Sequence, residues 1–197
     1  MIAEATRRSP LADYADRFSA LSTASNGELA IREFPFLSQV NFRGEPSDAE
    51  LMKRIASRLG GLALPRVPNT VLRRAERRAL WLSPDEWLIV GPENQQDTIN
   101  QALRVGLAGA FGSIVDVSAN RTVIEVRGAR ARDLLAHGVS IDLDEKAFDP
   151  GRCAQTLLAK AQVIVERRDE AAAFYLYVRS SFASYVADWL LDAARTL

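Results

Sequence analysis

Apolar residues that recur every three to four positions mark five segments of the chain as predicted amphipathic helices. Ser9-Pro10 is a typical helix start, with an N-cap serine followed by proline at the first helical position. Ser47 and Glu50 have the spacing of a capping box, and Gly60-Gly61 predicts the end of that helix. The predicted helices cover approximately residues 9–21, 47–59, 93–107, 128–135 and 182–191.

Shorter apolar runs between these helices predict strands. The first extended stretch, from Leu29 to Phe42, is uneven and contains Pro35, which indicates edge pairing or a bulge. Gly91-Pro92 predicts the end of another strand. The remaining predicted strands are 70–74, 78–82, 86–90, 113–117, 122–126, 154–159, 163–166 and 174–178.

The same order of elements occurs twice along the chain. Arg43-Gly44 and Arg127-Gly128, which lie 84 residues apart, each end a strand and begin a helix. Trp87-Leu88 and Tyr175-Leu176, 88 residues apart, each lie in the last strand before a helix. We interpret this as two copies of a strand–helix–strand–strand–strand–helix unit with an approximate two-fold relation. The alternative is that the similarity is accidental, because many α+β chains can be divided into similar halves.

The predicted fold class is therefore α+β, with antiparallel sheets, packed helices and two related halves. We expect residues 1–30 to form an N-terminal helix and extension, residues 31–110 the first half, and residues 111–197 the second half of one compact unit.

Composition excludes several classes of protein. The 197 residues are 48% hydrophobic and contain 25 Lys and Arg against 25 Asp and Glu, so the basic excess of a nucleic-acid binder is missing. A single Cys153 and a single His137 exclude an internal disulfide and a Cys/His zinc site. No apolar run is long enough for a membrane span, and residues 1–10 lack the apolar core of a signal peptide. These features predict a cytoplasmic location.

Candidate chemistry is sparse. Arg73, Arg74, Arg77 and Arg78 surround Glu76, and this basic stretch indicates either a solvated hairpin tip or a contact with an acidic partner or polyanionic ligand, such as a polyglutamylated folate. Cys153 and His137 are the only residues of their types, and for both we favour a structural role over a catalytic one. No catalytic triad or carboxylate pair emerges, so the residues alone indicate a binding or scaffold module.

The order of several motifs resembles the folate-binding domain of the glycine-cleavage T-protein superfamily. With the Ser9-Pro10-Leu11 start and the segment 82–88 in the first half, nearly the whole chain is most similar to the gamma-subunit family of heterotetrameric sarcosine oxidases. The motifs in the second half are Asp116-Val117-Ser118, Thr122–Gly128 (TVIEVRG), Ala129–Leu135, Pro150-Gly151-Arg152, Leu157-Leu158 and Phe174–Val178 (FYLYV).

This resemblance implies membership of a complex of alpha, beta, gamma and delta subunits. Such a complex oxidises sarcosine to glycine, reduces O2 to H2O2 and passes the one-carbon unit to tetrahydrofolate. The resemblance places FAD, FMN and NAD in the alpha and beta subunits, zinc in delta and the folate site in alpha. It therefore predicts a non-catalytic structural subunit, without a cofactor of its own, that packs chiefly against alpha.

A departure from the T-protein pattern agrees with this division. T-proteins have an acidic pair after Gly-Gly, and its first Asp serves the folate chemistry, whereas the matching stretch here is Ala161–Glu166 (AQVIVE). Val165 stands where that Asp would be, and Glu166 could replace it only after a one-residue shift that reverses its face of the strand. We assign no catalytic residue and keep Glu166 as the one candidate folate contact.

Two alternatives stay open at this point. One is a stand-alone folate-dependent aminomethyl or methyl transferase, and the other is the equivalent subunit of an N-methylglutamate-type dehydrogenase. For a subunit, we expect an apolar surface patch of several hundred Å² with few charges at its centre. Tyr14, Phe18, Phe34 and Phe36 are the predicted interface anchors, because the N-terminal segment lies outside the repeat.

Overall fold

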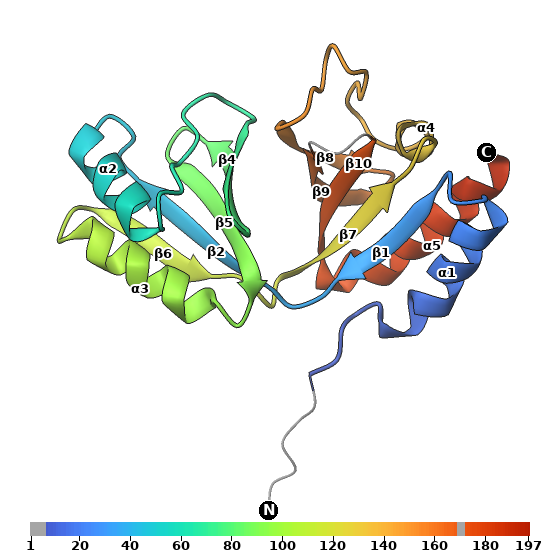
Figure 1. Cartoon of the computed structure of the whole chain (residues 1–197), viewed down its shortest axis with the longest axis horizontal. Coiled ribbons are helices and arrows are strands. Elements are labelled where there is room, and N and C mark those ends of the chain that lie inside the picture. The colour runs from blue at the N-terminus through green and yellow to red at the C-terminus, as the bar shows by residue number, and fades with distance from the viewer. Residues whose placement is uncertain (1–6, 169–171) are drawn as a thin grey trace, which may run out of the picture.

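Ten strands form two antiparallel five-stranded sheets in the computed structural model, which describes residues 7–168 and 172–197 (Figure 1). The first sheet has the order β3-β4-β5-β2-β6 and the second has the order β1-β7-β10-β9-β8. The strands are β1 (Ala30–Phe34), β2 (Leu37–Gly44), β3 (Val71–Arg74), β4 (Arg77–Ser83), β5 (Glu86–Glu93), β6 (Gly112–Asp116), β7 (Arg121–Arg127), β8 (Cys153–Leu158), β9 (Ala161–Arg167) and β10 (Ala173–Arg179).

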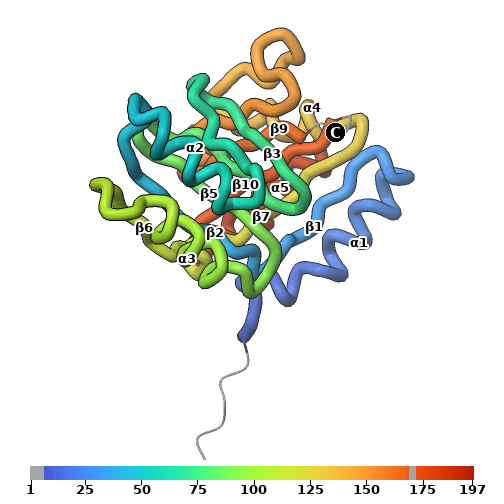
Figure 2. The backbone as a smooth tube through the Cα atoms, turned by 60° about the vertical axis from the view of Figure 1, so that its left-hand side comes forward, coloured from blue at the N-terminus to red at the C-terminus, as the bar shows by residue number. Residues whose placement is uncertain are grey.

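Five α-helices cover the outer faces of the two sheets, so the predicted α+β class is confirmed. Helices α2 and α3 pack on the first sheet, whereas α1, α4 and α5 pack on the second (Figures 1 and 2). The helices are α1 (Ala15–Ala24), α2 (Ala49–Arg58), α3 (Gln96–Leu107), α4 (Ala131–Ala136) and α5 (Ala183–Ala193). The arrangement is therefore four layers, with helices outside and the two sheets face to face.

Alternation along each strand divides its side chains between two cores. In β5, Trp87 and Ile89 point to the α2–α3 layer, whereas Leu88 and Val90 point to the other sheet. The Trp87 indole is fully buried, and its Nε1 donates a hydrogen bond of 2.7 Å to the Pro65 carbonyl. A buried polar group needs such a partner, so this bond orients the largest side chain of the first outer core.

The internal repeat is present in the structure. Its first copy is β2-α2-β3-β4-β5-α3 and its second is β7-α4-β8-β9-β10-α5. The four strands of each copy lie in the same spatial order within their sheets. The two copies therefore have the same topology, although in the sequence the repeat is visible only as loosely spaced motifs.

Each sheet takes its fifth strand from the other half, which the predicted boundaries do not reproduce. Strand β1, placed in the segment 31–110, pairs with β7, and β6, placed in the segment 111–197, pairs with β2. Helix α1, expected as part of an N-terminal extension, packs on the second sheet. Pairing between distant strands depends on contacts that local periodicity does not encode, so the sequence gives no sign of the exchange.

Hydrogen bonds at Gln39 join the start of β2 to the segment that connects β6 with β7. The Gln39 N–H donates to Ser118 Oγ at 3.0 Å, and the Val117 N–H donates to the Gln39 carbonyl at 2.9 Å. The Gln39 side chain, which is fully buried, donates through Nε2 to the Arg121 carbonyl at 2.9 Å. The start of β2 and the link β6–β7 therefore lie side by side where the chain passes from one sheet to the other.

Two local predictions were wrong. The N-cap of α2 is Asp48, whose Oδ1 accepts a hydrogen bond of 2.8 Å from the Leu51 N–H, while Ser47 bonds to Glu45 instead. Strand β5 continues through Gly91-Pro92 to Glu93, because a register shift opposite Leu37 leaves Pro92 between two paired positions. Proline has no N–H to donate, and a bulge removes the need for one.

No helix within residues 7–168 and 172–197 is long and apolar enough to cross a membrane.

A glycine at the start of the second copy allows β1 to approach β7, and its replacement tests this packing. Gly128 has φ +115°, and a Cβ there would overlap the Glu28 carbonyl. We expect Gly128→Ala to lower the free energy of unfolding by about 3 kcal/mol in urea titrations. The matched change Gly27→Ala, at φ +80° but with no atom near the new Cβ, should cost only about 1 kcal/mol. Equal losses would contradict the proposed close approach.

Candidate functional site

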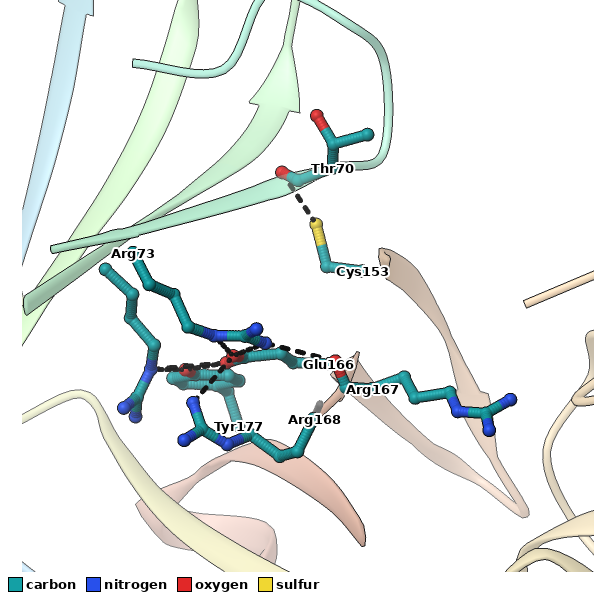
Figure 3. Close-up of polar contacts among 8 residues, drawn as sticks. Thr70, Arg73, Cys153, Glu166, Arg167, Arg168 and Tyr177 are labelled. Atoms are coloured by element: carbon teal, nitrogen blue, oxygen red, sulfur yellow. Dashed lines mark hydrogen bonds and ion pairs between the residues drawn. The ribbon is translucent and has the colours of Figure 1, made fainter. Parts of the chain in front are cut away.

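Glu166 lies in β9 and points toward the opposite sheet. Its neighbours Val163 and Val165 face the helix layer of α1, α4 and α5, whereas Ile164 lies in the core between the sheets. The Glu166 side chain has no exposed surface. The structure thus places the only candidate folate contact in the interface between the two sheets (Figure 3).

Four side chains from three strands and the segment after β9 surround this carboxylate. Arg73, which reaches over from β3, places Nη2 2.8 Å from Glu166 Oε1 and also donates to the Arg167 carbonyl at 3.1 Å (Figure 3). We call Glu166, Arg73, Arg78, Arg168 and Tyr177 the Glu166 cluster.

The second carboxylate oxygen is bound from both sheets. Arg78 of β4 places Nε 3.2 Å from Glu166 Oε2 and 2.7 Å from the Tyr177 hydroxyl. The Tyr177 hydroxyl donates to the same Oε2 at 2.5 Å. Arg168 approaches Oε1 at 3.4 Å. Both oxygens of Glu166 are therefore bonded to groups of the chain itself.

Burial and charge act in opposite directions within the Glu166 cluster. Burial disfavours the charged form of Arg78, but the neighbouring Tyr177 and Glu166 outweigh it and raise the Arg78 pKa. Burial raises the pKa of Tyr177 well above its usual value, so the phenol stays neutral and available as a donor. The Arg78 guanidinium also lies 4.8 Å from the ring centroid of Tyr175, a favourable cation–π distance.

The basic stretch Arg73–Arg78 therefore has two faces. Arg73 and Arg78 are paired across the β3–β4 hairpin and point inward to Glu166. Arg77 donates to Gln95 Oε1 at 2.9 Å, whereas Arg74 and Glu76 are exposed at the turn. Sequence reasoning missed Glu166 as the partner of this stretch. The two adjacent arginine pairs on either side of a predicted hairpin turn were the available signal, but nothing local identified a carboxylate almost a hundred residues away.

The four predicted interface anchors differ in how far they are exposed. Phe18 is only 4% exposed and belongs to the core under α1, so its ring is not available to a partner, and this prediction was wrong. Its position at helical spacing from Tyr14 directs it inward. Tyr14, Phe34 and Phe36 are half-buried, and Phe34 packs 5.2 Å from the Tyr175 ring. Their interface role stays a prediction.

A more exposed aromatic residue was missed. Phe111 precedes β6 and is 97% exposed. An exposed phenyl ring is unfavourable in water, so it is typical of a contact surface when other apolar side chains lie on the same element. Val115 of β6 is also exposed, at 48%. The available signal was an aromatic residue between Gly109 and Gly112, just before a predicted strand.

Cys153 and His137 show no catalytic setting. Cys153 is buried, its thiol lies 3.5 Å from the Trp81 carbonyl, and burial raises its pKa to about 12. His137 is exposed at the end of α4, with Nδ1 2.7 Å from the Asp133 carbonyl oxygen. Among the described residues, no group of three or more His, Cys, Asp or Glu side chains could hold a metal ion.

Comparison with known proteins identifies the family. Residues 43–196 match the sequence model of the sarcosine oxidase gamma subunit family. The chain belongs to this family. It is 36% identical over 188 residues to the sarcosine oxidase subunit gamma of Arthrobacter sp, covering 95% of this chain and 89% of the relative. The identity is 34% over 191 residues to the corresponding subunit of Corynebacterium sp. (strain P-1), with the same two coverages.

Solved structures agree in fold. A chain of the heterotetrameric sarcosine oxidase from Corynebacterium sp. U-96 superposes with a TM-score of 0.86 at 30% identity, covering 96% of this chain and 95% of that one. The glycine cleavage system aminomethyltransferase T from Bartonella henselae has a TM-score of 0.67 at 10% identity, over 95% of this chain and 57% of that one. The T-protein-like fold expected from the motifs is therefore confirmed.

Neutralising the buried carboxylate tests the structural role of the Glu166 cluster. Glu166→Gln leaves Arg73 and Arg78 near a neutral amide, so we expect the free energy of unfolding to fall by about 3 to 5 kcal/mol. Tyr177→Phe, which removes one donor, should cost about 1 to 2 kcal/mol. Urea titrations of both variants measure these losses. The exposed pair of Glu50 with Lys53 provides the control, and Glu50→Gln should leave stability almost unchanged. A Glu166→Gln variant as stable as this control would refute the role.

The buried thiol makes stability depend on alkaline pH. Between pH 9.0, where a free thiol loses its proton, and about 12, the unfolded chain releases a proton that the folded chain keeps. Stability should therefore fall as the pH rises through this window, by about 1.4 kcal/mol per pH unit from this group. Cys153→Ala should remove that part of the slope in urea titrations at pH 8 to 10.5. If the free energy of unfolding fell equally with pH in the parent and in Cys153→Ala, the thiol would not be buried as described.

Proposed function

We propose that the chain is the gamma subunit of a heterotetrameric sarcosine oxidase, in which it acts as a non-catalytic structural subunit. The observation that carries this proposal is the nearly complete superposition, with a TM-score of 0.86, on a chain of the Corynebacterium sp. U-96 enzyme. In this proposal the partners are the alpha, beta and delta subunits, chiefly alpha, in the cytoplasm. The whole complex converts sarcosine to glycine, with tetrahydrofolate as one-carbon acceptor and O2 reduced to H2O2.

The chemistry of the described residues supports the non-catalytic part of the proposal. Glu166 is bonded through both oxygens to the chain itself, and its side chain is fully buried. Burial keeps the Cys153 thiol protonated near neutral pH, so it is a poor nucleophile. FAD, FMN, NAD, zinc and tetrahydrofolate are assigned to the partner subunits, and no residue of this chain is assigned to hold them.

Exposed apolar surface supports the subunit part of the proposal. Phe111 and Val115 lie at the edge strand β6, and Phe34 and Phe36 lie half-buried at the link between β1 and β2. An edge strand with apolar side chains is a liability for an isolated protein, because its unpaired backbone groups can pair with another chain. Coverage by a partner subunit would remove that liability.

Co-expression of the tagged chain with the three other subunits tests the proposal. We expect a flavin-containing complex with all four chains in equal amounts, measured by native mass spectrometry and visible absorbance. Phe111→Asp should lower the yield of this complex without changing the stability of the isolated chain, whereas Phe111→Leu should preserve it. A chain that purifies alone and colourless under these conditions would contradict the proposal.

Turnover of the purified complex tests the non-catalytic role separately. Tyr177→Phe and Cys153→Ala perturb buried groups without preventing assembly. Both variants should leave sarcosine turnover per flavin within about twofold of the parent, because a structural change alters the amount of complex and not its rate. Loss of turnover in a fully assembled complex would show that this chain takes part in the reaction.

A further inference from the structure

Two arginines face each other on the inner side of the second sheet, away from the Glu166 cluster. Arg121 begins β7 and Arg179 ends β10, and the two residues are direct cross-strand partners. Like charges that lie opposite each other in antiparallel strands destabilise the sheet. Such a pair is compensated either by solvent or by an anion, and here Arg179 is exposed whereas Arg121 is half-buried.

The chain itself does not provide that anion. Within residues 7–168 and 172–197, neither guanidinium has a hydrogen bond or an ion pair with a carboxylate. Burial, and then the charge of Arg179, lower the pKa of Arg121. Glu86 acts in the opposite direction from the other sheet, but its oxygens are bound at 2.7 Å by Asn41 Nδ2 and at 2.5 Å by Arg43 Nη2. The Arg121–Arg179 pair is thus left without its own counterion.

A cavity of about 420 Å³ lies in front of the pair. This volume falls within the range of about 300 to 1,000 Å³ that is typical of small-molecule sites. Gln155 and Gln162 line it together with the two arginines, and Leu157 and Ile164 are apolar members of its lining. The lining combines two positive charges, amides and hydrocarbon, which fits an organic acid better than an inorganic ion.

We propose that this pocket binds a small carboxylate, held by Arg121 and Arg179. A guanidinium presents parallel N–H donors that match a carboxylate in a bidentate arrangement, and two opposed guanidiniums can bind its two oxygens from either side. Binding would remove the repulsion between the arginines, so ligand affinity and local stability are coupled. The inference rests on this chain alone and does not depend on the assembly proposed above.

Titration of the isolated full-length chain with succinate tests the pocket. We expect saturable shifts of the Arg121 and Arg179 Nε signals in ¹⁵N NMR spectra. Arg121→Gln and Arg179→Gln should each weaken binding about 10-fold or more, since each removes a charge-assisted contact. Each variant should also remain at least as stable as the parent without ligand, because it relieves a like-charge pair. The exposed Arg58→Gln is the matched control and should bind as the parent does.

The results also separate possible sources of the carboxylate. A free acid would bind both the isolated chain and the assembled complex. An acidic side chain of a neighbouring subunit would leave the pocket open to succinate in the isolated chain and closed in the complex. Absence of saturable shifts in the parent, or unchanged binding in Arg121→Gln and Arg179→Gln, would overturn the proposal. Tighter binding of inorganic phosphate than of succinate would overturn the assignment to a carboxylate.

Discussion

A buried carboxylate has to be matched by cations and hydrogen-bond donors, and in this chain that requirement fixes how the two sheets face each other. Glu166 and Tyr177 belong to the second sheet, whereas Arg73 and Arg78 belong to the first. Apolar contacts around them favour contact of the sheets but no particular alignment, because the hydrophobic effect is non-directional. The ion pairs form only when the β3–β4 hairpin lies over β9 and β10, so the Glu166 cluster selects one alignment.

The inner face of the second sheet carries two groups of charged side chains, one with counterions and one without. The Glu166 cluster compensates its buried charge within the chain, whereas Arg121 and Arg179 have no counterion among the described residues. Compensated charges of this kind serve structure, and uncompensated ones in a cavity are available for binding. Where the chain passes between the sheets, Gln39 of β2 is bonded to Val117, Ser118 and Arg121, and its bond to the Arg121 carbonyl joins the first sheet to β7 of the second.

Features of the fold that depend on local periodicity were predicted correctly from the sequence. Features that depend on contacts between distant residues were not. The α+β class, the repeat and most elements follow from apolar spacing and turn residues. The exchange of β1 and β6 and the pairing of Arg73 with Glu166 join residues roughly 70 to 100 positions apart, which no local pattern encodes. Phe18 was misplaced because an aromatic residue on a terminal helix has the same spacing whether it packs on its own sheet or on a partner.

A double-mutant cycle between Arg78 and Glu166 is the most direct measurement of the central claim, that the cluster is an internal link between the sheets. The variants Arg78→Met, Glu166→Met and the double variant are compared with the parent in urea. If the two groups stabilise each other across the interface, the double variant loses less stability than the two single losses combined, by about 2 kcal/mol or more. Losses that add to within about 0.5 kcal/mol would contradict the claim, because they would mean that the two charges act independently.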